Sequence, residues 1–203
     1  MSLAATTGVF PFEFQHVAVY TRPFPHFAAA DFLDVQLADS LLSWLAQGAQ
    51  WQPRKLIGYE GYADMSLQLG DLPCELDLLV APEFLSRLRI CMGRIFEMAV
   101  EGYVRVTAHR MVAGASLRPH SDLCALKFTH RLLVQLNRGW TEANGGLLCL
   151  FAGDPATEKN RQEKSFLPAH RSAFAFEVSG RSFHSVTNVV AGERYTLSYT
   201  FYP

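Results

Sequence analysis

The hydrophobic pattern changes at Gly102, and this change constrains the fold more than any other feature of the sequence. Over 103–112 the side chains follow a period of two, which places neighbours on opposite faces of an extended strand. Turn sequences then separate further short apolar runs, and we expect strands at 130–136, 147–152, 172–177, 183–190 and 194–201. The stretch 153–167 is expected to be a polar loop. Evenly spaced short strands are typical of a barrel or jelly roll.

The residues before Gly102 predict two amphipathic helices. The first is expected to begin after Asp34, a residue type that caps helix N-termini, and to end near Gly48. The second is expected to begin at Pro82. Its apolar stripe consists of Leu85, Leu88, Met92 and Ile95. Both helices are expected to pack against one face of the strands.

Two other segments of the first half predict less regular structure. Residues 1–27 are rich in aromatic residues and proline, and we expect an extended arm with an edge strand at 15–20. Residues 56–69 contain two glycines, and we expect an irregular strand or a loop. A chain of 203 residues has room for a sizeable core. We expect a single α+β domain, in which 1–102 supply helices and a lid and 103–203 supply the β core.

Composition and charge argue against several classes of partner. The net charge is −1 and no run of Lys or Arg is present, so we expect neither nucleic acid nor a membrane as a partner. No apolar run reaches membrane-spanning length, and the first residues lack the pattern of a signal peptide. The 4 Cys form no C-x-x-C pair, which favours free thiols in a reducing compartment. The expected location is the cytoplasm, and the sequence leaves the oligomeric state open.

Two candidate metal ligands, His120 and Asp122, stand two residues apart. In extended backbone both side chains leave the same face. A later histidine, His184, would complete a set of two histidines and one carboxylate, which binds non-haem iron on one side and leaves the opposite side open. An H-x-D pair alone is a weak motif in a chain with 7 His and 19 Asp and Glu. The interpretation therefore depends on the ordered set, which continues with Arg194.

The second half of the chain resembles the Fe(II)/2-oxoglutarate-dependent oxygenases, most closely their prolyl-4-hydroxylase-like branch. The matching segments are 120–122, 132–140, 144–151, 183–186 and 194–198. The resemblance implies a double-stranded β-helix, which is a jelly-roll or cupin-like barrel. It implies that His120, Asp122 and His184 hold Fe(2+), and that O2 and 2-oxoglutarate are co-substrates. The first hundred residues fit the family only loosely.

Arg194 is the candidate anchor for the far carboxylate of 2-oxoglutarate. It stands ten residues after His184, and its planar guanidinium can bond both oxygens of a carboxylate. Thr196 shares its strand face, and the resemblance implies that this hydroxyl assists. Arg110 and Gln135 stand where the prolyl-hydroxylase pattern often has tyrosines that bind the co-substrate. We therefore expect Arg110 and Gln135 in the co-substrate pocket, and a different oxo acid stays an alternative.

Two further arginines are candidates for binding substrate. Arg131 shares a strand face with Gln135, and we expect it either to bind a substrate carboxylate or the co-substrate, or to pair with a carboxylate of the first half of the chain. Arg118 either meets substrate or is a solvated loop residue. The residues of the first half that either form a lid or pack in the core are Phe12, Tyr59, Tyr62 and Met65.

The expected function is that of a 2-oxoglutarate- and Fe(II)-dependent dioxygenase. By resemblance, it would hydroxylate an unactivated C–H of an amino acid, a peptide or a protein residue. One alternative is a cupin-like metal enzyme that does not use 2-oxoglutarate. Another is a jelly-roll binding module without catalysis. The sequence does not distinguish hydroxylation from desaturation or cyclisation, which begin with the same hydrogen abstraction.

Overall fold

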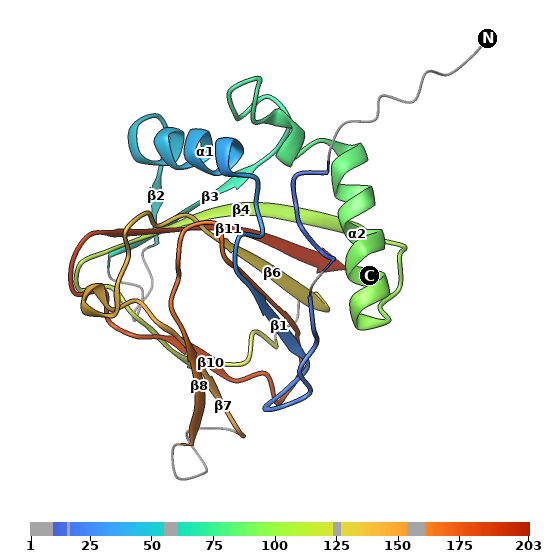
Figure 1. Ribbon diagram of the computed structural model, residues 1–203, viewed down its shortest axis with the longest axis vertical. Helices are drawn as coiled ribbons and strands as arrows, with labels where there is room; N and C mark the ends of the chain where they lie inside the picture. Colours follow the sequence, from blue (N-terminus) through green and yellow to red (C-terminus); the bar gives the residue numbers. More distant parts are fainter. Residues whose placement is uncertain (1–9, 16, 55–60, 124–126, 154–160) are drawn as a thin grey trace.

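The strands form two antiparallel sheets (Figure 1). The computed structural model describes residues 10–15, 17–54, 61–123, 127–153 and 161–203. Within these ranges the larger sheet has seven strands in the order β1-β9-β6-β11-β4-β3-β2, and the smaller has four in the order β5-β10-β7-β8. All of the pairings are antiparallel. This is the jelly-roll core of a double-stranded β-helix, so the predicted fold class is confirmed.

The elements have the following bounds. The larger sheet contains β1 (His26–Ala29), β2 (Gln52–Pro53), β3 (Tyr62–Leu67), β4 (Tyr103–Val112), β6 (His130–Gln135), β9 (Ala173–Glu177) and β11 (Glu193–Tyr202). The smaller sheet contains β5 (Leu117–His120), β7 (Leu148–Phe151), β8 (Gln162–Phe166) and β10 (His184–Val186). The helices are α1 (Val35–Gln47), α2 (Pro82–Phe96) and two 3-10 turns, η1 (Asp77–Leu79) and η2 (Glu142–Asn144).

The two α-helices cover the face of the larger sheet that points away from the smaller sheet (Figure 1). Helix α1 begins where predicted, because Asp34 Oδ1 accepts hydrogen bonds from the backbone N–H groups of Gln36 (2.9 Å) and Leu37 (3.0 Å). Helix α2 begins at Pro82, as predicted. None of the described helices combines the length and apolar composition that a membrane-spanning helix needs.

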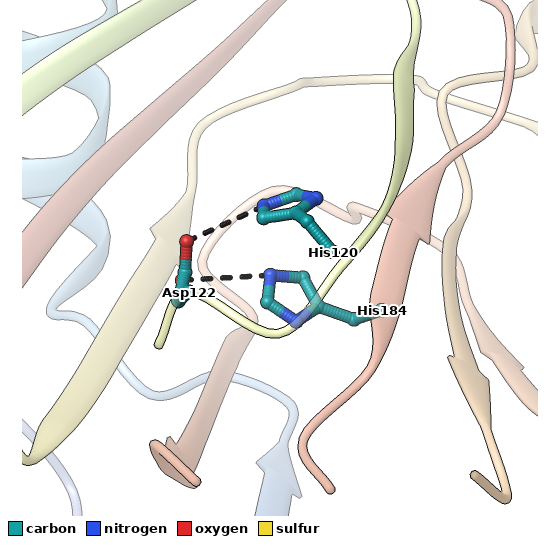
Figure 2. Close-up of side chains that lie close together, drawn as sticks. All are labelled: His120, Asp122 and His184. Atoms are coloured by element: carbon teal, nitrogen blue, oxygen red, sulfur yellow. Dashed lines mark ion pairs between the residues drawn. The ribbon is translucent and has the colours of Figure 1, made fainter. Parts of the chain in front are cut away.

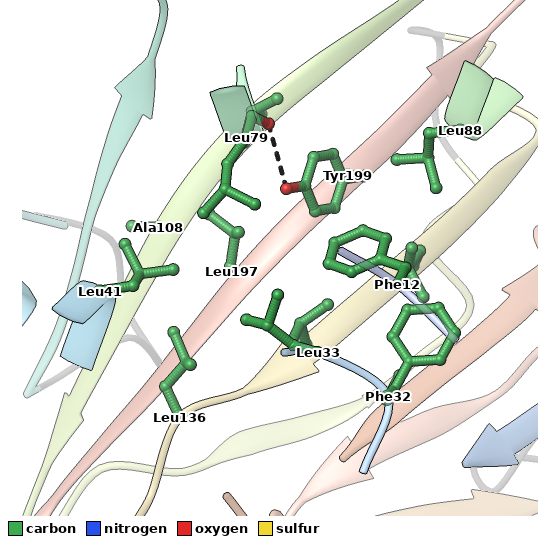
Figure 3. Packing of buried hydrophobic residues seen from close by; sticks show 14 of the residues in the cluster. Phe12, Phe32, Leu33, Leu41, Leu79, Leu88, Ala108, Leu136, Leu197 and Tyr199 are labelled. Atoms are coloured by element: carbon green, nitrogen blue, oxygen red, sulfur yellow. Dashed lines mark hydrogen bonds between the residues drawn. The ribbon is translucent and has the colours of Figure 1, made fainter. Parts of the chain in front are cut away.

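Alternation along β11 separates the hydrophobic core from a cavity. Leu197 and Tyr199 point toward the helices and are buried there, and the Tyr199 hydroxyl donates a hydrogen bond to the carbonyl of Leu79 (3.1 Å; Figure 3). Thr196 and Thr200 lie on the opposite face and line the cavity. The same strand therefore supplies the core and one wall of the site.

Several predicted elements need correction. The edge strand expected at 15–20 is wrong, because the strand lies at β1, and Tyr20 makes only an isolated bridge with His26. Part of 56–69 is a regular strand, β3, which pairs with β4 over six residues. Residue 16 and residues 55–60 lie outside the described part of the chain. Strands from the first half thus extend the larger sheet.

The smaller sheet contains two strands that the hydrophobic pattern did not predict. Strand β8 lies within the expected polar loop 153–167, of which residues 154–160 are not described. It is an edge strand that pairs only with β7, so its side chains remain largely exposed and can be polar. Strand β5 is four residues long and partly exposed. Neither strand needs an apolar sequence.

Leu41 offers a test of the packing between α1 and the sheet. It is fully buried, so Leu41→Ala should lower the free energy of unfolding by about 2–5 kcal/mol, since it removes buried methyl groups and leaves a cavity. Urea denaturation followed by circular dichroism measures this change. Leu69→Ala is the control, because Leu69 is 60% exposed and its loss should change stability by less than about 0.5 kcal/mol. Equal effects of the two substitutions would contradict the assigned core.

His130 offers a test of pH dependence. Burial, with a smaller effect of the Arg89 charge, lowers the pKa of His130 to about 4. The unfolded chain therefore takes up a proton near pH 6.5 that the folded chain takes up only near pH 4, so stability is lost as the pH falls through this window. The slope should reach about 1.4 kcal/mol per pH unit for this one group. Urea denaturation at pH 7 and pH 5 should show a smaller acid loss for His130→Phe than for the unsubstituted chain.

Candidate metal centre

Two histidines and one carboxylate meet in the cavity between the sheets (Figure 2). His120 ends β5, His184 begins β10, and the two are register partners across the smaller sheet. Asp122 follows two residues after β5. One ligand atom from each residue can be chosen so that all three lie within 4.8 Å of one another. The structure therefore brings together the three residues that the motif predicted as ligands.

Hydrogen bonds to the backbone orient both imidazole rings. His120 Nδ1 lies 2.7 Å from the carbonyl oxygen of Arg118, and His184 Nδ1 lies 2.8 Å from that of Ser182. A carbonyl oxygen can only accept, so Nδ1 carries the proton in each ring. The Nε2 atoms then face Asp122, at 3.3 Å from Oδ1 for His120 and 3.6 Å from Oδ2 for His184. This orientation is typical of histidines that bind metals.

Asp122 has a backbone conformation that is unfavourable for most residues other than glycine. Its φ is 62°, in the left-handed region that Asp tolerates better than most residues. Its Oδ2 atom is buried without a hydrogen-bond partner among the described atoms, although Arg131 Nη1 lies 3.2 Å away as an ion-pair partner. A buried polar atom left without a hydrogen bond is costly. A cation bound between the three side chains would satisfy it, so these residues fit a metal ion.

The ionisation states of His184 and Asp122 suit metal binding. Burial lowers the pKa of His184 to about 4, with partial opposition from the Asp122 charge, so this ring is neutral at pH 7, as a ligand must be. Burial raises the pKa of Asp122, but the His120 hydrogen bond and the Arg131 charge outweigh it and hold that pKa well below its usual value. The carboxylate is therefore ionised. Burial lowers the pKa of His120, and its contact with Asp122 more than offsets this, so the pKa is raised overall.

Arg194 forms a buried cationic group in the same cavity. Its Nε donates to the carbonyl of Gly146 (2.9 Å), and its Nη1 donates to Thr196 Oγ1 (2.8 Å). Thr196 in turn donates to Gln135 Oε1 (2.9 Å). Burial lowers the pKa of Arg194 to about 10, with partial opposition from Tyr62, so the guanidinium stays charged at pH 7. Gly146 permits this contact, because a Cβ there would lie 3.0 Å from Arg194 Cδ.

Sequence reasoning left His109 out of the site, but the structure places it on a cavity wall. Its Nδ1 lies 2.6 Å from the Tyr62 hydroxyl, and its Nε2 lies 2.9 Å from Thr107 Oγ1. Burial, with smaller effects of nearby arginines, lowers its pKa to about 3, so the ring is neutral. The period of two along β4 was the signal for this placement, since Thr107, His109 and Met111 all line the cavity.

Arg110 does not line the cavity that contains the three candidate ligands, so the prediction that places it in a co-substrate pocket there is corrected. It lies on the other face of β4, where its Nη1 is 4.0 Å from a Glu193 oxygen and its guanidinium is 5.5 Å from the centre of the Trp51 ring. Gln135 does not line this cavity; it is the register partner of Thr196 on β6 and accepts the hydrogen bond of the Thr196 hydroxyl. Arg118 is exposed and does not line the cavity either.

Arg131 does line the cavity, but its partner differs from the predicted one. It pairs with Asp122 and not with a carboxylate from the first half of the chain. Of the residues considered for a lid, Tyr62 lines the cavity, whereas Phe12 and Met65 pack in the core beneath the helices. Tyr59 lies outside the described residues.

Comparison with known proteins identifies the family. The family model of the 2OG-Fe(II) oxygenase superfamily matches residues 106–201. Residues 106–201, which contain the three candidate ligands, therefore match the sequence pattern of this superfamily. Its members use Fe(II), 2-oxoglutarate and O2, and the chain is therefore a 2-oxoglutarate-dependent dioxygenase. No curated protein matches the sequence.

Solved structures of this superfamily share the fold. A prolyl-4-hydroxylase from Pseudomonas putida is 21% identical with a TM-score of 0.70, over 87% of this chain and 91% of that one. A prolyl hydroxylase from Trichoplax adhaerens is 13% identical with a TM-score of 0.61, over 87% and 83%. A viral collagen prolyl hydroxylase from Paramecium Bursaria Chlorella virus-1 is 15% identical with a TM-score of 0.56, over 86% and 93%. At these identities the likeness concerns the fold.

The geometry of the three ligands predicts the effect of removing one. We expect Asp122→Ala and His184→Ala each to weaken Mn(II) binding by at least about 100-fold, because even outer partners of metal ligands are worth 10–100-fold in affinity. Isothermal titration calorimetry measures the affinity. His170→Ala is the matched control, since His170 pairs with Asp39 outside the cavity. Unchanged affinity after either ligand substitution would contradict the proposed centre.

Proposed function

We propose that His120, Asp122 and His184 bind the Fe(II) ion of this dioxygenase. The observation that carries the proposal is the convergence of their ligand atoms within 4.8 Å inside the cavity. The buried and hydrogen-bond-free Oδ2 of Asp122 supports it. The chain contributes the orientation of the rings through the Nδ1–H bonds to backbone carbonyls. Arg131 Nη1 lies 3.2 Å from Asp122 Oδ2 and helps to keep this carboxylate ionised.

We further propose that Arg194 and Thr196 bind the far carboxylate of 2-oxoglutarate. Both are buried, and both line the cavity that contains the three ligands. A buried guanidinium without a carboxylate partner among the described side chains is costly. A dicarboxylic oxo acid would supply that partner at one end and two metal-binding oxygens at the other. Tyr62, whose hydroxyl is hydrogen-bonded to His109 Nδ1, lines the same cavity.

The reaction we propose is hydroxylation of a C–H bond in an amino acid residue, either free or within a peptide. Bound Fe(II), with 2-oxoglutarate and O2, supplies the oxidising chemistry. The protein supplies a cavity of about 260 Å³ that is partly closed by apolar side chains, which limit access of water to the reacting atoms. Support for a peptide substrate comes from the Trichoplax adhaerens relative, which is described in complex with a hypoxia inducible factor peptide fragment.

We also propose that the protein is located in the cytoplasm. The three described cysteines, Cys74, Cys91 and Cys149, are all free thiols. Free thiols are usual in reducing compartments.

An anaerobic titration tests the proposed centre. Adding Fe(II) and then 2-oxoglutarate to the metal-free protein should produce a weak visible charge-transfer band that requires both ligands. Arg194→Gln should raise the 2-oxoglutarate concentration for half-formation of the band at least about 30-fold, since losing one partner of a buried ion pair costs 2 kcal/mol or more. Arg138→Gln is the control, because Arg138 is exposed and pairs with Asp39.

The other outcomes of this titration identify the rival functions. Metal binding without a 2-oxoglutarate-dependent band would indicate a cupin-like metal enzyme that does not use the oxo acid. Absence of metal binding would indicate a binding module. A band of normal strength in Arg194→Gln would contradict the assigned anchor while leaving the metal centre in place.

A further inference from the structure

Four arginines line the cavity, and they differ in how their charges are balanced. Arg54 and Arg131 pair with Asp64 and Asp122, respectively, and Arg194 is the proposed anchor of 2-oxoglutarate. Arg105 is different. Among the described residues it has no carboxylate partner, and its guanidinium donates to the hydroxyl of Ser66 (2.7 Å).

The charges of the loaded cavity do not cancel. Fe(II) and the dianion of 2-oxoglutarate neutralise each other. Four guanidinium groups and two carboxylates line the described walls. Among the groups of the described walls, two positive charges therefore remain when iron and oxo acid are bound. A site with a positive excess and low-dielectric walls attracts an anionic partner.

Arg105, which has no carboxylate partner among the described residues, belongs to a row of three residues on neighbouring strands. Thr200 of β11 pairs in register with Arg105 of β4 on one side and with Arg131 of β6 on the other. All three line the cavity. Strands lie about 4.8 Å apart, so the Cα atoms of the two arginines are about 10 Å apart. This span accommodates a small acid or one amino acid residue.

The two ends of this row have different surroundings. Arg131 lies over the ring of Phe128 (4.9 Å from its guanidinium carbon to the centroid) and contacts the candidate iron ligand Asp122. Arg105 is exposed at the cavity rim. Thr200, which is 5% exposed, presents its side chain between them. A ligand whose anion is bound at the rim would therefore extend along Thr200 toward the metal centre.

We propose that the substrate carries a carboxylate, and that Arg105 and Thr200 bind it at the rim while the carbon to be oxidised points toward His120, Asp122 and His184. This inference rests on the proposed function. Two sources provide the same chemistry: the terminal α-carboxylate of an amino acid or peptide, and the side chain of an acidic residue in a peptide. A guanidinium suits either, since it bonds both carboxylate oxygens.

Matched probe pairs test this inference. The protein is loaded with Mn(II) and saturating 2-oxoglutarate without O2, and paramagnetic broadening of probe protons is measured by NMR. One pair is N-acetyl-L-proline and N-acetyl-L-prolinamide, which tests a terminal carboxylate. The other is N-acetyl-prolyl-glutamate amide and N-acetyl-prolyl-glutamine amide, which tests an acidic side chain. The carboxylate member of one pair should be broadened at least about fivefold more than its amide, and the responsive pair identifies the source.

Substitutions at the rim complete the test. Arg105→Gln should remove the preference for the carboxylate, and Arg105→Lys should restore part of it, because the positive charge returns without the planar fork. Arg87→Gln should keep the full preference, since Arg87 lies over Phe10, outside the cavity. Equal broadening of carboxylate and amide probes in both pairs would overturn the inference, as would an unchanged preference in Arg105→Gln.

The charge-transfer band separates this result from the proposed function. A normal band together with no carboxylate preference would overturn only the inference about substrate. Absence of the band in the unsubstituted protein would overturn the proposed function itself. Loss of the band in Arg105→Gln would show that Arg105 supports the metal centre, and this too would overturn its assignment to substrate.

Discussion

The pairing of β11 with two neighbours is the constraint on which the rest of the structure depends. Strand β11 pairs with β4 along its whole length from Glu193 to Tyr202, and with β6 over six residues. Side chains alternate, so this register buries Leu197 and Tyr199 under the helices and turns Arg194 and Thr196 into the cavity. A slip by one residue would exchange the two sets. The burial of Leu197 and Tyr199 therefore fixes the register of β11, and this register also places the guanidinium of Arg194 in the cavity.

The sequence predicted the helices and strands that are determined by residues close together in the chain. The alternation over β4 predicted its bounds, and Asp34 and Pro82 predicted where the two helices begin, since caps and periods act within a few residues. Edge strands were missed, because β8 is exposed on its outer side and can have a polar sequence. The convergence of His120, Asp122 and His184 followed from motif order, while their use as iron ligands remains a prediction.

The surroundings of the centre could not be predicted, because they depend on cross-strand register. Position relative to the H-x-D motif suggested Arg110 for the co-substrate pocket, whereas the pleat of β4 turns His109 inward and Arg110 outward. The contact of His109 with Tyr62 joins residues 47 positions apart. Arg131 pairs with Asp122, whose backbone lies in the left-handed region. The alternation along β4 separates its two faces, but these cross-strand contacts have no signal in a single sequence.

The central place of β11 also determines when the cavity can form during folding. Its two neighbours, β4 and β6, precede it in the chain by many residues, and they lie on either side of it in the sheet. Until residues 193–202 have left the ribosome, β4 and β6 lack the strand that lies between them. The apolar faces of these two strands are then not part of one continuous sheet. Pairings between such distant segments form slowly because a long loop must close first. The cavity should therefore form only after β11 has been synthesised, and metal uptake should follow.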